Sequence, residues 1–144
     1  MMIEITDGTA RLTIEVLARS CPDSDYWDGN WCVTPIKAIL LGFQAAFNGE
    51  MELPELQAFY QGLQQLYAEL RGAAHLNTRE RFLELTAEIN SRGHIHWSVR
   101  LADTSGSANM ARLTFEMRSD QSYLPALLAQ IEAVLEMFPV KGQP

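Results

Sequence analysis

Apolar and polar residues alternate over positions 3–5 and again over 12–16, on either side of the turn dipeptide Asp7-Gly8. A repeat of two residues is typical of a strand with one buried face. Two such strands around an Asp-Gly turn predict a β-hairpin at the start of the chain. Residues 20–31 follow neither a strand nor a helix repeat, so we expect a loop there.

Beyond this loop, the pattern predicts a strand and then a helix. Residues 33–47 are apolar and rich in β-forming side chains, which favours one long or bent strand with a kink at Gly42. Apolar residues then recur at helical spacing over 56–70. Pro54 suits the first turn of this helix, and Gly72 is a natural stop.

Two further segments, 82–89 and 94–101, alternate with their apolar residues at odd positions. A three-residue loop, Ser91-Arg92-Gly93, places Ile89 opposite Ile95 and gives Gly93 the left-handed position that such loops favour. On the opposite face, this register pairs Glu84 with Arg100, Thr86 with Ser98 and Glu88 with His96. Opposite charges then lie across from each other, which supports an antiparallel hairpin in this register.

The last third of the chain predicts one more strand and one more helix. After a loop, residues 112–117 alternate with their odd-numbered apolar side chains facing inward. An apolar stripe at helical spacing begins at Leu124, and Pro139 ends it. Asp120 or Ser122 is expected to cap the helix.

The elements follow in the order strands, helix, strands, helix, which has too little alternation for parallel βαβ units. We therefore expect an α+β fold: a largely antiparallel β-sheet of about five to six strands with two amphipathic helices packed on one face. Residues 1–139 would form a single domain, and residues 140–144 a frayed tail. The other face of the sheet would be solvated or would bind a partner; it carries Glu84, Glu88, His96, Arg100, Arg112, Thr114 and Glu116.

Composition narrows the choice of partner. The chain has 144 residues, 47% of them hydrophobic, and a formal net charge of -7. An acidic surface repels phosphate backbones, so we expect no direct contact with nucleic acid but a partner protein with a basic surface. Cys21 and Cys32 are expected to be reduced thiols in a cytoplasmic protein, because no signal peptide and no membrane-spanning run is found.

No sequence motif predicts an enzyme, since the G-x-S-x-G, Walker and G-x-G-x-x-G patterns are absent. His94 and His96 lie two residues apart on a strand and project from one face. They could ligate zinc with His75, Glu84 or Glu88 as a third ligand. The simpler interpretation is a Glu–His pair on a half-exposed strand, and on that basis we expect no metal, no cofactor and no catalytic residue.

The segment DYWDGNW, residues 25–31, concentrates aromatic and acidic side chains. Asp-Gly is a strong turn signal, so the segment could be a turn that buries its aromatic side chains. It could equally be a binding anchor, because Trp and Tyr are enriched in interface hot spots and carboxylates attract basic partners. Both interpretations hold if Trp31 lies in the core while Tyr26 and Trp27 are exposed.

Four segments follow one another in a distinctive order: DYWDGNW, ELQAFYQGLQQLY, GHIHWSVRL and LTFEMRSDQSYL. This order resembles the WapI-like family of bacterial immunity proteins, whose members carry a D-x-D-G-N-W-like segment, an E-L-x-x-F helix start and a D-Q-T/S-x-L segment. The resemblance covers residues 20–139. It implies a non-enzymatic protein that binds and neutralises the toxic C-terminal domain of a polymorphic, contact-delivered toxin, often a nuclease.

The residues expected to bind this partner follow from composition and predicted exposure. They are Asp23, Asp25, Tyr26, Trp27, Asp28, Glu84, Glu88 and His96, whereas Gly29, Trp31, Gly93 and Trp97 are expected to be structural residues of turns or core. The protein would be a monomer or a weak homodimer without membrane contact. Two alternatives stay open: a small metal-dependent enzyme that uses the His94/His96 strand, and a structural or regulatory module that dimerises through a sheet edge or its polar face.

Overall fold

The computed structural model describes residues 1–103 and 111–144 of the chain. A first sheet contains β1 (Met2–Thr6), β2 (Arg11–Glu15), β3 (Ala18–Arg19), β4 (Trp31–Ile39) and β5 (Gln44–Glu52). A second sheet contains β6 (Gly72–Asn77), β7 (Leu83–Ile89), β8 (His94–Asp103) and β9 (Ala111–Asp120). The helices are α1 (Tyr26–Gly29), α2 (Leu53–Glu69) and α3 (Leu124–Met137), with a 3₁₀ turn η1 at Gln121–Tyr123.

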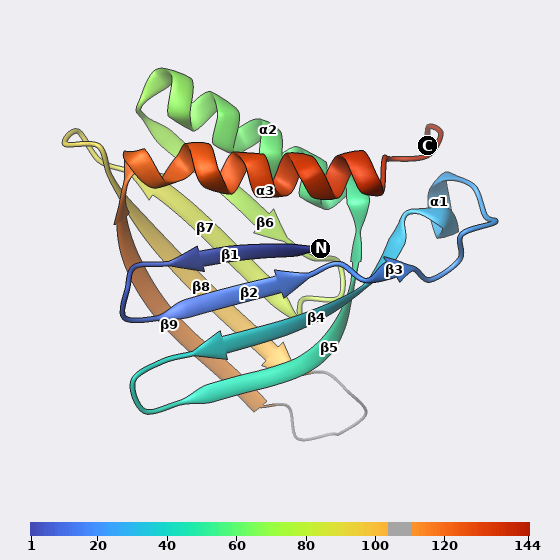
Figure 1. Cartoon of the computed structure of the whole chain (residues 1–144), viewed down its shortest axis with the longest axis horizontal. Helices are drawn as coiled ribbons and strands as arrows, with labels where there is room; N and C mark the ends of the chain where they lie inside the picture. Colours follow the sequence, from blue (N-terminus) through green and yellow to red (C-terminus); the bar gives the residue numbers. More distant parts are fainter. Residues whose placement is uncertain (104–110) are drawn as a thin grey trace.

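All described strand pairs are antiparallel, so the predicted α+β class is confirmed. The predicted strand number was too low, and the single sheet was wrong. Figure 1 shows the first sheet lying in front of the second, with their strands crossing. Buried side chains from both sheets and from α2 and α3 form one hydrophobic cluster. The inner face of each sheet therefore packs on the other sheet, because each sheet has a single apolar face to bury.

The helices do not cover one face of a sheet as predicted. Instead, α3 packs beside β1 and α2 beside β6, and the two helices contact each other (Figure 1). They lie along the edge strands of the two sheets. The apolar stripe of each helix thus closes the same open side of the layered core.

The predicted single strand over 33–47 was also wrong. The chain forms β4 and β5, which pair with each other along their whole length. A turn joins them, in which the Leu40 N–H donates to the Phe43 carbonyl oxygen at 2.8 Å. At its tip the side chain of Leu41 is 90% exposed and that of Phe43 is 68% exposed. Apolar residues at a hairpin tip break the usual polar turn pattern, which explains the error.

Strand β6 was missed altogether. Helix α2 ends at Glu69 and is capped by Leu70, whose φ angle of 54° is left-handed; Gly72 with φ 93° then starts the strand. Ala74 and Leu76 point into the core opposite residues of β7. Alanine and glycine have low β propensity, so this segment lacks a strand signal despite its position beside β7.

The hairpin of β7 and β8 has the register that was predicted from the sequence. Its register pairs Ile89 with Ile95, Glu84 with Arg100, Thr86 with Ser98 and Glu88 with His96, as predicted. Strand β9 extends this sheet with its odd-numbered side chains turned toward the core, and the opposite face is polar. The predicted loop at 102–109 lies mostly outside the described residues, and its first two residues, Ala102 and Asp103, belong to β8.

The predicted last helix is confirmed as α3, but a 3₁₀ turn, η1, precedes it and takes the predicted cap residue. Asp120 accepts a hydrogen bond from the Ser122 N–H at 2.8 Å and so caps η1 rather than α3. This bond lowers the pKa of the Asp120 carboxyl group. Helix α3 follows directly, with Pro125 in its first turn, where the missing N–H of proline costs no helical hydrogen bond.

Candidate partner-binding surfaces

The DYWDGNW segment folds into the single helical turn α1 and the start of β4. Asp25 caps the turn, because its side chain accepts a hydrogen bond from the Trp27 N–H at 3.3 Å and its carbonyl one from the Gly29 N–H at 2.6 Å. Gly29 is buried against Ser24. A Cβ atom at Gly29 would lie 2.8 Å from the Ser24 carbonyl carbon and closer still to its oxygen. A residue without a side chain is therefore required at this position.

Asn30, which sequence reasoning did not select, lies under this turn with only 1% of its surface exposed. Its Nδ2 atom donates to the carbonyl oxygens of Tyr26 at 2.9 Å and Lys141 at 3.0 Å. Its Oδ1 atom accepts from the Lys141 N–H at 2.8 Å. One buried amide thus connects α1 to residues near the end of the described chain.

Charged side chains strengthen this connection. The Arg19 guanidinium donates to the Gly29 carbonyl oxygen at 2.7 Å and also to the Pro139 carbonyl oxygen. The Lys141 ammonium group donates to the carbonyl oxygen of Pro22. Helix α1 is therefore held from two sides, by β3 and by the segment after α3. We call this set of contacts the α1 clasp: Arg19, Asn30 and the segment 139–141.

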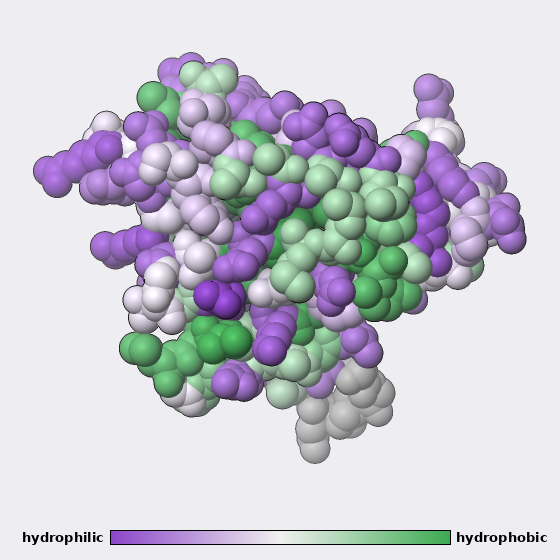
Figure 2. Space-filling view, in the orientation of Figure 1, coloured by the Kyte–Doolittle hydropathy of each residue, from purple (hydrophilic) through white to green (hydrophobic). Residues whose placement is uncertain are grey.

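The outer surface of α1 is exposed. Trp27 is 56% exposed and stands edge-on to the half-buried Tyr26 ring at a centroid distance of 5.2 Å. Asp23, Asp25 and Asp28 are exposed, and the carboxylates of Asp23 and Asp28 form no ion pair within residues 1–103 and 111–144. Trp31 is half-buried. Figure 1 shows α1 projecting beyond the sheets, and the same region of Figure 2 is largely hydrophilic.

The negative charge of the protein is concentrated in the part of the chain that contains α1. Residues 1–60, which include the whole first sheet, carry nine acidic and three basic side chains. Residues 61–144 carry nine acidic and eight basic ones. A basic partner is therefore attracted toward the first sheet and α1 more strongly than toward the second sheet.

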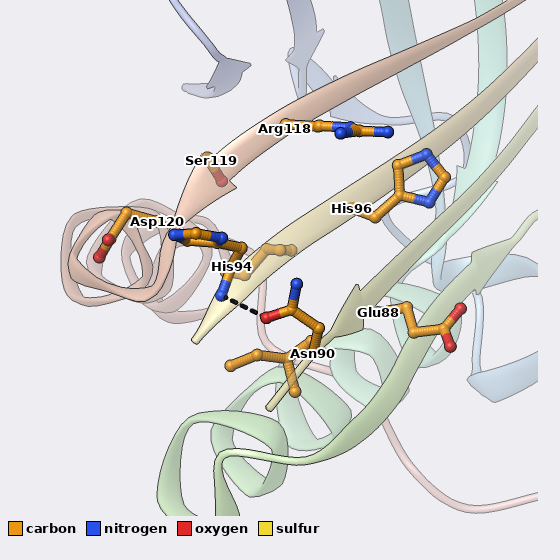
Figure 3. Close-up of a pocket in the computed structure, with 9 residues that line it drawn as sticks. Glu88, Asn90, His94, His96, Arg118, Ser119 and Asp120 are labelled. Atoms are coloured by element: carbon orange, nitrogen blue, oxygen red, sulfur yellow. Dashed lines mark hydrogen bonds between the residues drawn. The ribbon is translucent and has the colours of Figure 1, made fainter. Parts of the chain in front are cut away.

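The outer face of the second sheet holds the other predicted binding residues, Glu84, Glu88 and His96. A hollow of about 660 Å³ lies at one end of this face (Figure 3), lined by Glu88, Ile89, Asn90, His94, Ile95, His96, Arg118, Ser119 and Asp120. Two carboxylates of this face lie next to a basic side chain or an imidazole: Glu84 lies 3.6 Å from Arg100, and Glu116 lies 3.2 Å from His96. The His96 Nε2 atom is not aligned for a hydrogen bond with Glu116 and has no such partner in the described part.

The two histidines of the alternative metal site do not converge. In Figure 3 the His94 ring is turned toward Asp120 and the His96 ring lies beside Arg118. The third histidine, His75, lies with its Nδ1 atom 3.1 Å from the Thr86 hydroxyl group. Among the described residues, no three His, Cys, Asp or Glu side chains are grouped so that they could hold a metal ion. The structure therefore offers the metal-dependent alternative no ligand set in this part.

The residues that were expected to be structural include Trp97 in the core and Gly93 in a turn. Trp97 is completely buried, and its indole N–H donates to the Ser119 hydroxyl group at 2.8 Å. Gly93 has a left-handed φ angle of 79° in the hairpin loop. Both cysteines are free thiols: Cys21 is exposed, while burial raises the pKa of Cys32 to about 11.

A model of the Immunity protein WapI-like family matches residues 2–139, and the chain belongs to this family. The resemblance drawn from the motifs is confirmed, and the match also includes the first hairpin, which those motifs did not cover. A search of curated proteins finds no match.

Family membership indicates a toxin-neutralising role and favours a non-enzymatic one. Within the described residues, no helix has both the length and the apolar character to span a membrane. No motif or spacing marks Arg19, Asn30 or Lys141 as parts of the α1 clasp. Asn30 follows Asp28-Gly29 and therefore reads as an ordinary turn residue.

Proposed function

We propose that this protein neutralises the toxic C-terminal domain of a bacterial polymorphic toxin by binding it directly in the cytoplasm. The observation that carries the proposal is the family match over residues 2–139. The protein would act by occupying or distorting the toxin's active surface, as a monomer or weak homodimer and without metal or cofactor. Binding alone is sufficient for inhibition when the complex is tight.

We place the main contact at the exposed side of α1. Trp27 presents a large aromatic side chain to solvent, and such side chains dominate interface energetics once they are buried by a partner. The carboxylates of Asp23 and Asp28 are exposed and form no ion pair in the described part of the chain, so a partner need not break an existing pair to reach them. Together they form an aromatic anchor surrounded by negative charge.

The toxin domain would then present a basic surface. Nuclease toxins fit this requirement, because a surface that binds a phosphate backbone is positively charged and would bind an acidic inhibitor in its place. Complementary charge accelerates association and makes it sensitive to salt. The acidic residues 1–60 supply this long-range attraction, and α1 supplies the close contact.

The outer face of the second sheet is the second candidate contact. Glu88 and His96 line its hollow, which offers a partner one carboxylate and one imidazole to contact. Its acidic side chains are less suited to a basic partner, because Glu84 and Glu116 already lie next to Arg100 and His96. We therefore rank this face below α1.

The experiment is co-expression in a bacterium with the toxic domain encoded immediately upstream of this protein's gene. The proposal predicts that growth is restored and that the two proteins co-purify as a complex. A catalytically inactive toxin variant provides the control for complex formation without selection. Failure both to restore growth and to bind the toxin would refute the proposed function.

A further inference from the structure

We infer that Asn30 and the segment 139–141 are positioning groups that hold α1 in the conformation that binds the partner. The binding element is then made from two parts of the chain that are 111 residues apart in sequence. This inference rests on the proposed function for the binding part and on the α1 clasp for the structural part. Neither Asn30 nor Lys141 has to touch the toxin for it to hold.

Helix α1 needs support from outside. It has only four residues, and a single helical turn is unstable in water because its few hydrogen bonds do not compensate the lost backbone freedom. Its local backbone bonds are few: those of the Asp25 cap and one from the Asn30 N–H to the Asp28 carbonyl oxygen. An unsupported segment 23–30 would therefore sample many conformations, and Trp27 would have no fixed direction.

Asn30 supplies this support with nearly all of its hydrogen-bonding capacity. Its amide group donates two bonds, to Tyr26 and Lys141, and its oxygen accepts from the Lys141 N–H and, at 3.3 Å, from Arg19. The side chain is buried, so losing these partners would leave polar atoms unsatisfied. The bonds fix the distance between the start of α1 and the segment after α3.

The segment 139–141 completes the clasp from the other side. The Pro139 carbonyl oxygen accepts from Arg19, and the Lys141 ammonium group donates to Pro22. The Lys141 stem also packs against α1, since its Cδ atom would lie 3.4 Å from a Cβ atom at Gly29. Residues on both sides of α1 are thus held by the same short segment.

The consequence for binding follows from the fraction of molecules in which α1 is ordered. If the clasp opens, the toxin must select the ordered minority, and the apparent affinity falls in proportion to that fraction. An ordered fraction of about one tenth to one hundredth would weaken binding about 10- to 100-fold. The two packed sheets do not depend on these bonds, so the fold itself should persist.

The test compares Lys141→Pro with Lys141→Ala. Proline removes the N–H that donates to Asn30, whereas alanine keeps the backbone N–H and carbonyl and removes only the side chain. We expect Lys141→Pro to bind the toxic domain at least about tenfold more weakly, and its amides at residues 27–30 to exchange hydrogen faster. Lys141→Ala loses the contact with Pro22 and the packing of the stem but keeps both backbone bonds to Asn30, so it should bind more tightly than Lys141→Pro and show slower exchange at residues 27–30.

A second pair of variants separates loss of the clasp from strain caused by proline. A chain that ends at Val140 lacks both backbone bonds to Asn30, and a chain that ends at Gly142 keeps them. The inference expects the shorter chain to behave like Lys141→Pro. It also expects amides of the core strands β7 and β8 to exchange at unchanged rates in all four variants.

Equal affinity and equal exchange at 27–30 in both members of each pair would overturn the inference. Faster exchange throughout the molecule would overturn it too, because the bonds would then serve overall stability rather than the position of α1. Hydrogen exchange is measured without toxin and therefore tests the clasp by itself. If the parent protein does not bind the toxic domain at all, the proposed function and the binding part of this inference fail, whatever the exchange rates are.

Discussion

Adding one methyl group at Gly29 should disturb the α1 segment more than the same change at any open glycine. The new Cβ atom would lie 2.8 Å from the Ser24 carbonyl carbon, which is part of the backbone and has no rotamer to change. Ordinary contacts between carbon atoms are about 3.5–4.0 Å. Either α1 or the Ser24 peptide must therefore move by about 1 Å.

This displacement has a calculable cost. Overpacking a tight site costs about 1–3 kcal/mol. The Gly29 carbonyl oxygen also accepts the 2.7 Å bond from Arg19, which the movement would strain. For a domain of this size, each 1 kcal/mol corresponds to a fall of about 2–4 °C in melting temperature. We therefore expect Gly29→Ala to melt about 2–12 °C below the parent protein.

Gly42→Ala is the matched control, because no atom lies within 4 Å of the Cβ that would be added there. It should be neutral, or stabilising by up to about 1 kcal/mol through a lower entropy of the unfolded chain. Thermal and urea denaturation of both variants, followed by circular dichroism, give the comparison. Equal stability of the two variants would refute the packing argument at Gly29.

Three further predictions concern aromatic side chains, a buried hydrogen bond and a thiol. Trp27→Ala should weaken toxin binding by about 2 kcal/mol or more in a calorimetric titration with little change in melting temperature, whereas Trp31→Ala should mainly lower the melting temperature. Ser119→Ala should destabilise the fold by about 1–3 kcal/mol in urea denaturation, because the buried indole N–H of Trp97 loses its acceptor. Cys32 should resist thiol reagents at pH 8 until the protein unfolds, because burial raises its pKa from 9.0 to about 11.

The raised pKa of Cys32 also predicts that the folding stability of the protein falls as the pH rises above 9. Between pH 9.0 and about 11 the unfolded thiol loses its proton while the folded thiol keeps it, so this contribution to stability is complete below pH 9 and is lost as the pH rises. Rapid labelling of Cys32 in the native protein would contradict its burial, with exposed Cys21 as the internal control.

For Ser119→Ala the control is Ser98→Ala, which changes an exposed serine of β8, and equal loss of stability in the two variants would refute the hydrogen-bond argument. Equal losses of melting temperature for Tyr26→Ala, Trp27→Ala and Trp31→Ala would favour a purely structural segment.

The elements that were predicted correctly are those whose structure is determined by residues close together in the sequence. The second hairpin is the clearest case, because the loop length and the Glu84–Arg100 pairing demand the same register. The helices α2 and α3 were predicted for a similar reason, since their apolar stripes are long and regular. Local sequence patterns failed at β6, whose alanines are placed in a strand by their neighbour β7 rather than by their own propensity.

The contacts of the α1 clasp could not be predicted from local sequence patterns. Asn30 and Lys141 are 111 residues apart, and neither residue type signals its partner in the sequence. Likewise, apolar alternation predicts that a strand has a buried face but not whether a helix or a second sheet covers it. For this reason the polar face around Glu88 and His96 was foreseen, whereas the division into two sheets was not.

We propose that the toxin binds at α1 rather than at the outer face of the second sheet. Two double variants that each remove two negative charges test it: Asp23→Asn with Asp28→Asn, and Glu84→Gln with Glu88→Gln. Affinity for the purified toxic domain is measured by calorimetric titration at low and at high salt. We expect the first variant to bind about tenfold more weakly or worse, with reduced salt dependence, and the second to stay within about threefold of the parent. A larger loss for the second variant, or equal losses for both, would contradict a toxin contact at α1.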